Sequence, residues 1–271
     1  MSCPRLMAQD TQRRFLGIQK LYGQHGYHNI IHSHICIIGI GGVGSWAAES
    51  FARSHVNEIS LIDLDHVAES NINRQVHALS STLGQSKISA MADRITGINS
   101  ECTVHKIDEH LTTENIPSLI NTHFSYVVDC IDNFRIKAAL IAYCRSHKIK
   151  LITIGGAGGR IDPARIKLAD LARAEGDALL AKTRKQLRTQ HHFPRNLKRR
   201  FDIPCIFSNE TQRYPTDDHQ VSTEKSRCSS TGGLSCADGY GSLSAVTATF
   251  GMLASAYVLS KIASISNNKT L

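Results

Sequence analysis

A glycine-rich segment near the amino end of the chain has the spacing of a phosphate-binding loop. Gly39, Gly41 and Gly44 form the pattern G-x-G-x-x-G, with Gly42 at a variable position, between an apolar run and a stretch with helical periodicity. Glycines allow a tight turn and close backbone approach, and a helix N-terminus attracts anionic phosphate. Asp63 ends the next apolar run, where an acid meets the hydroxyls of a ribose. The spacing predicts a nucleotide site.

The residues after Asp63 favour ATP over a dinucleotide such as NAD. Arg74 and Lys87 supply positive charge, and Asn71 supplies an amide donor. A dinucleotide needs no further cations here, whereas the pyrophosphate that leaves ATP has to be neutralised. Taken singly, Arg74 also suits a surface ion pair and Lys87 a solvated helix. Their order behind the glycine pattern favours a triphosphate site.

An acidic segment after a later apolar run is a candidate magnesium site. Asp132 lies in Asp-Cys-Ile-Asp-Asn, residues 129–133. Ligands bind at the carboxyl ends of parallel strands, and Mg2+ prefers oxygen ligands and bridges phosphates. The alternative is that Asp132 and Asn133 only cap the helix that follows. We expect Asp132 to hold Mg2+ against ATP.

Alternating short apolar runs and amphipathic stretches set the expected fold. The predicted strands are residues 35–39, 59–63, 103–107, 125–130 and 150–154; the predicted helices are 43–53, 85–99 and 134–147, with a short one after Thr112. This alternation predicts an α/β, Rossmann-like, doubly wound and mainly parallel sheet. Residues 163–240 are polar and basic in part, which predicts two or three short strands, a basic helix and loops. No linker is visible, so we expect one domain over residues 1–271, with 163–240 as its substrate-facing part.

Composition excludes several classes of protein. The chain has 271 residues, of which 41% are hydrophobic and 20% charged, which excludes a disordered chain. None of the 8 cysteines forms a C-x-x-C pair, so we expect no zinc site built on cysteine pairs. We expect the protein to work in a reducing, cytoplasmic compartment. The span 239–260 carries no charge and is long enough to cross a membrane, but its many Ser, Thr and Ala residues favour a core helix.

Together these motifs resemble the adenylation fold of the ubiquitin-activating-enzyme superfamily. The resemblance rests on G-x-G-G-V-G-S, on Asp63 and Asp65, on Ser-Asn-x-Asn-Arg-Gln, on Lys87 and on Asp-Cys-Ile-Asp-Asn. Within it, residues 155–163 and 138–145 resemble the tRNA threonylcarbamoyladenosine dehydratases, from about residue 13 to residue 262. The resemblance implies that Asp63 binds ribose, that Asn71, Arg74 and Lys87 bind the phosphates of ATP, and that Arg74, Lys87 and Asp132 serve catalysis.

The implied reaction is an ATP-dependent cyclisation of threonylcarbamoyladenosine next to the anticodon of tRNA. Adenylation of the carboxylate is followed by ring closure, and the second step is intramolecular, so no protein nucleophile is required. Cys236 is the candidate if a thiol takes part, although a structural role suits it better. The resemblance also implies a homodimer.

Three other functions remain open at this stage. The main alternative is an adenylyltransferase that activates the Gly-Gly end of a small sulfur-carrier protein; against it stand the missing cysteine pairs and Gly17, which replaces the second arginine of an R-x-x-R pair begun by Arg14. An NAD-dependent oxidoreductase would leave Arg74, Lys87 and Asp132 unexplained. The third is a non-catalytic nucleotide-binding module.

A basic run is the candidate contact for tRNA. Residues 182–200 contain eight Lys or Arg and no acid, within a chain whose net charge is +8. Such a run neutralises phosphates and makes binding depend on salt. We expect Lys198, Arg199 and Arg200, the basic triplet, to contact the RNA backbone, and the rings of residues 191–193 to stack on unpaired bases. The alternative is a solvated basic face.

Overall fold

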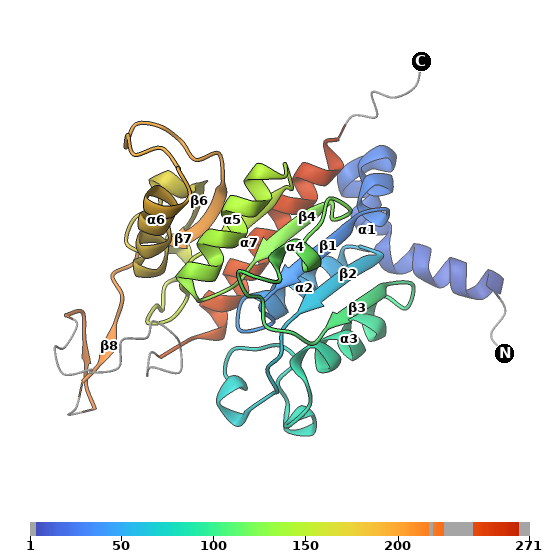
Figure 1. The fold of residues 1–271 in the computed structure, drawn as a ribbon. Helices are drawn as coiled ribbons and strands as arrows, with labels where there is room; N and C mark the ends of the chain where they lie inside the picture. Colours follow the sequence, from blue (N-terminus) through green and yellow to red (C-terminus); the bar gives the residue numbers. More distant parts are fainter. Residues whose placement is uncertain (1–3, 217–218, 225–240, 266–271) are drawn as a thin grey trace, which may run out of the picture.

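The computed structural model describes residues 4–216, 219–224 and 241–265, and its centre is a seven-stranded sheet. The strand order is β3-β2-β1-β4-β5-β7-β6 (Figure 1). The strands are β1 (His34–Ile38), β2 (Glu58–Ile62), β3 (Thr103–Ile107), β4 (Tyr126–Asp129), β5 (Leu151–Ile154), β6 (Ile166–Asp170) and β7 (Pro204–Ser208). All neighbouring pairs are parallel except β6 with β7. The order reverses between β1 and β4, which is where ligands bind in doubly wound sheets.

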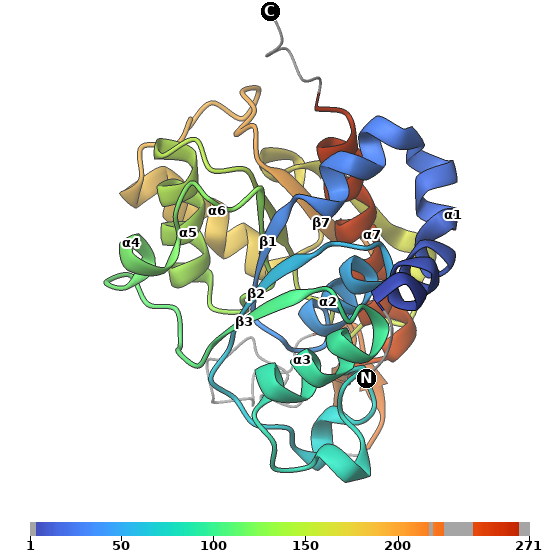
Figure 2. The same ribbon diagram turned by 90° about the vertical axis from the view of Figure 1, so that its right-hand side faces the viewer.

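Helices cover both faces of this sheet (Figure 2). They are α1 (Pro4–Ile31), α2 (Gly44–Arg53), α3 (Lys87–Ile98), α4 (Ile116–Leu119), α5 (Phe134–Ser146), α6 (Ala178–Gln190) and α7 (Ser244–Ala263). Helices α1, α2, α3 and α7 lie on one face, and α4, α5 and α6 on the other. The predicted doubly wound α/β fold is therefore confirmed, and each predicted strand lies within one or two residues of its expected bounds.

Alternation along the strands produces two separate hydrophobic cores. Ile35 and Ile37 of β1 pack into the core with α2 and α7, whereas Cys36 and Ile38 pack into the core with α5 and α6. Because successive side chains of a strand point to opposite faces, a strand buried on both faces is apolar throughout. This explains why the apolar runs of the first half predict the central strands so closely.

The second half of the chain extends the same sheet. β6 and β7 come from the region 163–240, and β7 pairs with β5 while β6 forms the antiparallel edge. A small hairpin follows, of β8 (Tyr214–Pro215) and β9 (Val221–Ser222). The basic helix expected here is α6, and its first turn is capped by Asp177, which accepts from the backbone N–H of Leu180.

Helix α7 is long and apolar enough to cross a membrane, yet it packs inside the fold. Val246, Phe250, Ala254 and Val258 are fully buried, and half of its most apolar window is buried. Gly251 lies so close to α2 that a Cβ there would come within 2.6 Å of the Val43 carbonyl oxygen. This close approach of two backbones is what the small residues of the segment allow, as the core-helix interpretation expects.

Candidate functional site

The predicted site residues follow the carboxyl ends of three adjacent strands. Ile38 of β1 pairs with Ile62 of β2 on one side and with Asp129 of β4 on the other. The glycine loop, Asp63 and the segment leading to Asp132 begin directly after this row. The structure thus brings to one edge of the sheet three motifs that are far apart in sequence.

The glycine loop has a geometry that other residues would disturb. Gly39 has a φ of +86°, and a Cβ there would lie 3.0 Å from the carbonyl oxygen of Cys130. A Cβ on Gly44 would lie 1.9 Å from the carbonyl oxygen of Gly39. The loop is therefore folded tightly on itself and against the end of β4. Its turn leads into α2, whose first N–H groups have no side-chain cap, as a phosphate site requires.

Asp63 fastens the loop to the end of β2. Its Oδ2 accepts from the backbone N–H of Ile40 at 2.6 Å, and its Oδ1 accepts from that of Asp65 at 2.8 Å. Burial raises the pKa of the Asp63 carboxyl, against the opposing effect of Lys87 and these hydrogen bonds. A carboxylate oxygen can accept more than one hydrogen bond, so Asp63 retains acceptor capacity for ribose hydroxyls.

Lys87 is held at the start of α3 by Asp65. Its Nζ donates to Asp65 Oδ2 at 2.6 Å, and this hydrogen bond lowers the pKa of the Asp65 carboxyl. Lys87 is buried, with an exposed fraction of 6%, while Asp65 is exposed. The ammonium is thus fixed beside Asp63 rather than solvated. The alternative interpretation of Lys87 as a solvated helix residue is therefore wrong.

Arg74 lies against the glycine loop. Its Cγ and Cδ atoms would be 3.4 Å from a Cβ on Gly42, and its carbonyl oxygen accepts from Trp46 Nε1 at 2.9 Å. Asn71 has a structural task, since its side-chain oxygen accepts from the backbone N–H of Ala68 at 3.1 Å. Arg74 is therefore placed beside the loop as expected, and Asn71 is tied into the turn that presents it.

Asp132 and Asn133 have different roles. Asn133 caps α5 by accepting from the backbone N–H of Arg135 at 3.0 Å, so the capping interpretation is correct for this residue. The Asp132 side chain is exposed, two residues after Cys130, whose carbonyl group lies against Gly39 of the loop. One exposed carboxylate together with the phosphates of a nucleotide is a usual donor set for Mg2+, so Asp132 fits the metal expected from the sequence.

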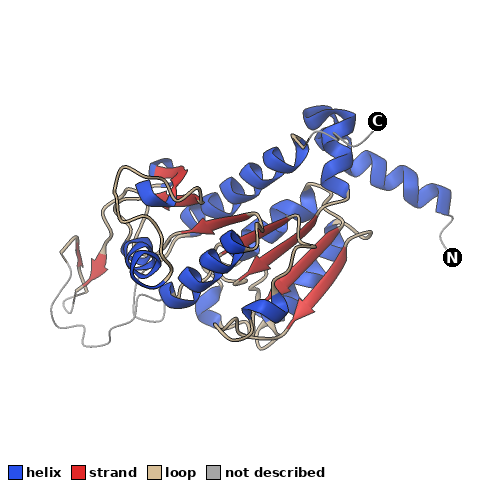
Figure 3. Ribbon diagram, turned by 45° about the horizontal axis from the view of Figure 1, so that its top comes forward, coloured by secondary structure: helices blue, strands red, loops and turns tan. Residues whose placement is uncertain are grey.

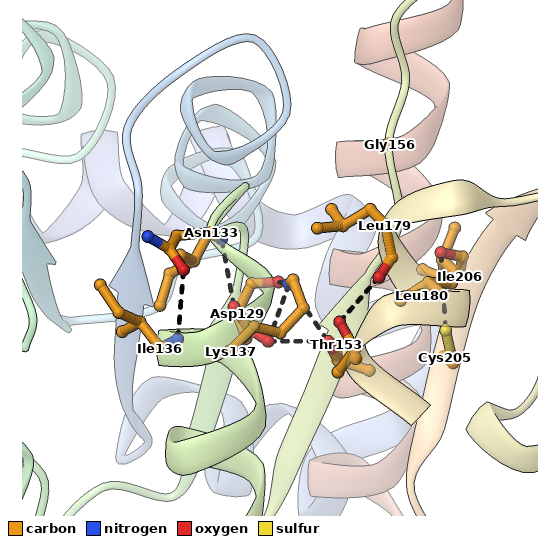
Figure 4. A network of polar contacts seen from close by, with 12 residues as sticks. Asp129, Asn133, Ile136, Lys137, Thr153, Gly156, Leu179, Leu180, Cys205 and Ile206 are labelled. Carbon is orange, nitrogen blue, oxygen red and sulfur yellow. Dashed lines mark hydrogen bonds and ion pairs between the residues drawn. The ribbon is translucent and has the colours of Figure 1, made fainter. Parts of the chain in front are cut away.

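A buried ion pair beneath this segment was not predicted. Lys137 Nζ lies 2.8 Å from Asp129 Oδ2, and both side chains are fully buried (Figure 4). Thr153 Oγ1 donates to the same Asp129 oxygen at 2.7 Å, and Asp129 Oδ1 accepts from the backbone N–H of Ile131 at 3.1 Å. These contacts connect β4, α5 and β5 and fix the course of the chain that leads to Asp132.

Another group of ligand-type side chains lies at the opposite edge of the sheet. Among the described residues, His34, Glu58 and His105 are the only His, Cys, Asp or Glu cluster whose ligand atoms lie within 4.8 Å of one another. They are paired through Glu58 Oε1, which is 3.0 Å from His105 Nε2. Because His34 and Glu58 begin β1 and β2, this cluster is separate from the nucleotide edge.

The basic run divides into buried and exposed parts. The basic triplet is exposed, as expected, and Arg200 Nε lies 3.7 Å from Asp170 Oδ2 and 3.5 Å from Asp202 Oδ1. The triplet precedes the amino end of β7, whereas the nucleotide motifs follow carboxyl ends (Figure 1). The expected stacking by Phe193 is wrong: its ring is only 4% exposed and packs edge-on against Phe201. An apolar ring in this short loop is more stable in the core than in water.

Arg14 and the buried cysteines do not belong to the described site. Arg14 Nη1 donates to the carbonyl oxygen of Ile98, at the end of α3 farthest from Lys87. Cys236 lies outside the described residues. The buried cysteines Cys36, Cys144 and Cys205 have their pKa values raised by burial and are small residues of the core.

Comparison with known proteins places these features in a family. The ThiF family model matches residues 13–271. The tRNA threonylcarbamoyladenosine dehydratase of Escherichia coli is 44% identical over 251 residues, which cover 93% of this chain and 94% of that protein. The protein of the same name from Haemophilus influenzae is 45% identical over 251 residues, with the same coverage.

The structural comparison gives the same relation. The crystal structure of the E. coli enzyme in complex with ATP has a TM-score of 0.82 and 42% identity, covering 93% of this chain and 94% of that one. By contrast, the molybdopterin-synthase adenylyltransferase of Salmonella typhimurium is 32% identical over 137 residues, only 51% of this chain and 54% of that protein. The chain belongs to the ThiF family, on the branch of the tRNA threonylcarbamoyladenosine dehydratases.

Proposed function

We propose that this protein uses ATP to cyclise threonylcarbamoyladenosine next to the anticodon of tRNA. The observation that carries the proposal is the convergence of the glycine loop, Asp63, Arg74, Lys87 and Asp132 at the carboxyl edge of the sheet. This arrangement suits a ribose-bearing triphosphate. The similarity to the E. coli dehydratase over nearly the full length of both chains supports the choice of substrate.

The reaction takes two balanced steps. An oxygen of the threonyl carboxylate attacks the α-phosphorus of ATP, forming an acyl-adenylate while the bond to pyrophosphate breaks. The carbamoyl group of the same substrate then attacks the activated carbonyl carbon, loses a proton, and displaces AMP together with the original carboxylate oxygen. The second step joins two groups of one molecule, so proximity contributes as much as about 7–11 kcal/mol in the best cases.

The protein's part is to bind and to neutralise charge. Backbone N–H groups of the glycine loop and the start of α2 face the phosphates, and Asp63 accepts from the ribose. Arg74 and Lys87 stabilise the charge that develops on the leaving pyrophosphate. Lys87 is already desolvated and positioned by Asp65, so little reorganisation is needed.

Asp132 would hold Mg2+ at the same edge. The ion, when bound, neutralises charge on the phosphate oxygens of ATP. Asp132 would fix the position of the ion, because the backbone that leads to it is held by the buried contacts of Asp129 and Lys137.

Assembly as a homodimer is part of the proposal. Helix α1 bends at Gly23, where φ is +70°, and its first half extends away from the body of the molecule (Figure 3). Leu21 near this bend is 73% exposed. An apolar side chain on a projecting helix is stabilised by packing against a second copy. We further propose that residues 1–271 act as one adenylation domain in the cytoplasm, where tRNA is found.

The test uses tRNA that carries threonylcarbamoyladenosine with heavy oxygen in its carboxylate. Incubation with ATP and Mg2+ should yield a nucleoside lighter by one water, with one heavy oxygen recovered in AMP. Omission of ATP is the control. An unchanged nucleoside would refute the substrate, and heavy oxygen absent from AMP would refute carboxylate adenylation. Pyrophosphate exchange that requires a protein ending in Gly-Gly would instead support the sulfur-carrier alternative.

A further inference from the structure

A cavity of about 430 Å³ lies beyond the carboxyl end of β7, at the same edge of the sheet as the nucleotide motifs. Its walls are the first half of α6 and the chain that follows β7. The side chains that matter most are Asp177, Arg184, Glu210, Gln212 and Tyr214. Its volume falls in the range of pockets that hold small molecules, about 300–1,000 Å³.

The cavity is connected to the nucleotide edge through β5. Thr153 pairs with Asp129 in register and donates to its carboxylate. Two residues later the chain turns at Gly155, where a Cβ would lie 2.2 Å from Asp177 Oδ2, and the N–H of Gly156 donates to that oxygen at 2.9 Å. A group held in the cavity is therefore at the ends of β5 and β7, next to the strand that leads to Asp132.

The acidic groups in the walls already bind the backbone. Asp177 accepts from Gly156 and, through Oδ1, from the N–H of Leu180 at 2.9 Å. Glu210 Oε2 accepts from the N–H of Ile161 at 3.1 Å and from that of Asp162 at 2.9 Å. Their oxygens are therefore committed to holding the loop after β5 and the first turn of α6.

Arg184 is different, because one nitrogen of its guanidinium lacks an acceptor. Its Nη1 is buried and has no hydrogen-bond partner in the part of the chain that the structure describes. Burial and the nearby Arg188 lower the pKa of Arg184. Arg184 as a whole is half-buried, and a shielded N–H of a guanidinium favours an anionic or carbonyl oxygen as its partner.

The remaining groups suit a nucleobase. Gln212 and Tyr214 are linked by a hydrogen bond of 3.3 Å from Tyr214 Oη to Gln212 Oε1. Asn209 and Thr211 add further amide and hydroxyl groups to the wall. Amide and hydroxyl groups beside an aromatic ring are typical of pockets that bind unstacked bases of single-stranded RNA loops.

We propose that this cavity, the α6 pocket, receives the modified nucleoside of the tRNA, and that Arg184 donates to the oxygens of its threonylcarbamoyl group. The inference rests on the proposed function and adds the substrate site, which the nucleotide motifs do not contain. A base extruded from the anticodon loop would enter the α6 pocket and direct its carboxylate towards the nucleotide edge.

The test compares Arg184→Gln and Arg184→Lys with the matched control Arg188→Gln in the full-length protein. Arg188 lies one turn further along α6, where its Nε donates to the carbonyl oxygen of Pro194 and its guanidinium stacks over Phe201. For each variant, the KM for modified tRNA, the KM for ATP and the affinity for unmodified tRNA are measured. The free nucleoside threonylcarbamoyladenosine serves as a competitive probe, with adenosine as its control.

Arg184→Gln should raise the KM for modified tRNA and the inhibition constant of the free nucleoside about tenfold or more, the loss expected for one hydrogen bond to a charged group. The KM for ATP and the affinity for unmodified tRNA should not change, and Arg188→Gln should leave the inhibition constant of the free nucleoside at its wild-type value. Arg184→Lys, which keeps the charge, should have a smaller defect and serves if the glutamine variant does not fold.

Two results would overturn the inference while leaving the proposed function intact: wild-type KM values for both Arg184 variants, or an equal rise of the free nucleoside's inhibition constant in Arg188→Gln. A wild-type protein that leaves modified tRNA unchanged in the presence of ATP would refute the proposed function itself.

Discussion

Replacing Lys137 by methionine should unfold the protein far more easily, although the residue touches no predicted ligand. The Lys137 ammonium and the Asp129 carboxylate are both fully buried and 2.8 Å apart. Methionine fills a similar volume but leaves Asp129 charged and compensated only by Thr153 and one backbone N–H. Removal of one partner from a buried pair costs about 3–5 kcal/mol, which lowers Tm by roughly 10 °C for a chain of this size.

Urea unfolding followed by the fluorescence of the single tryptophan, Trp46, measures this loss. The matched control is Lys182→Met, at an exposed lysine on α6, which should cost less than about 0.5 kcal/mol. The double variant Asp129→Asn with Lys137→Met should recover much of the stability, because no unpaired charge remains. A loss below about 1 kcal/mol in Lys137→Met, or a double variant no more stable than the single one, would refute the reasoning.

Four further outcomes are expected. Asp132→Asn should lower the rate of adenylation at least about tenfold in a pyrophosphate-exchange assay, while Tm stays within about 2 °C because the side chain is exposed. Gly44→Ala should lose ATP binding in calorimetry together with thermal stability, whereas Gly41→Ala, whose Cβ meets nothing within 4 Å, should keep the stability. Burial lowers the pKa of His77 to about 4. Below about pH 6.5 the unfolded chain therefore binds a proton that the native state does not, and the free energy of unfolding falls by roughly 3 kcal/mol from pH 7 to pH 4. His77→Gln should reduce this dependence of stability on pH, measured by urea unfolding. Changing the basic triplet to alanine should weaken the binding of all tRNAs alike and reduce its dependence on salt, without changing the affinity for ATP.

The glycine loop, Asp63 and the segment before Asp132 could be predicted because their positions follow from short-range rules. Each motif ends an apolar run, and parallel strands place such ends at one edge. The structure adds the register, with Ile62, Ile38 and Asp129 in one row. Spacing and composition were therefore enough to predict that the nucleotide motifs lie together.

The contacts that stabilise this edge could not be predicted in the same way. Lys137 lies within a helical pattern, where a lysine usually faces solvent, and only the return of α5 over β4 and β5 brings it to Asp129. The α6 pocket combines Asp177 and Arg184 with Glu210 and Tyr214, which come together because β7 inserts beside β5. The sequence of β7 is short and apolar and does not specify which strand it will pair with.

The basic run contains residues for two different contacts with tRNA, one to the modified base and one to the RNA backbone. Helix α6 buries Thr183 and Leu187 and has 13 residues, so it spans about 20 Å. Arg184 lies at its middle beside the α6 pocket, whereas the basic triplet lies in the chain between the end of α6 and β7. Loss of Arg184 should therefore discriminate between modified and unmodified tRNA, and loss of the triplet should not. If both changes weakened all tRNAs equally, the run would be a uniform electrostatic surface, and the separation of base recognition from backbone contact along α6 would be wrong.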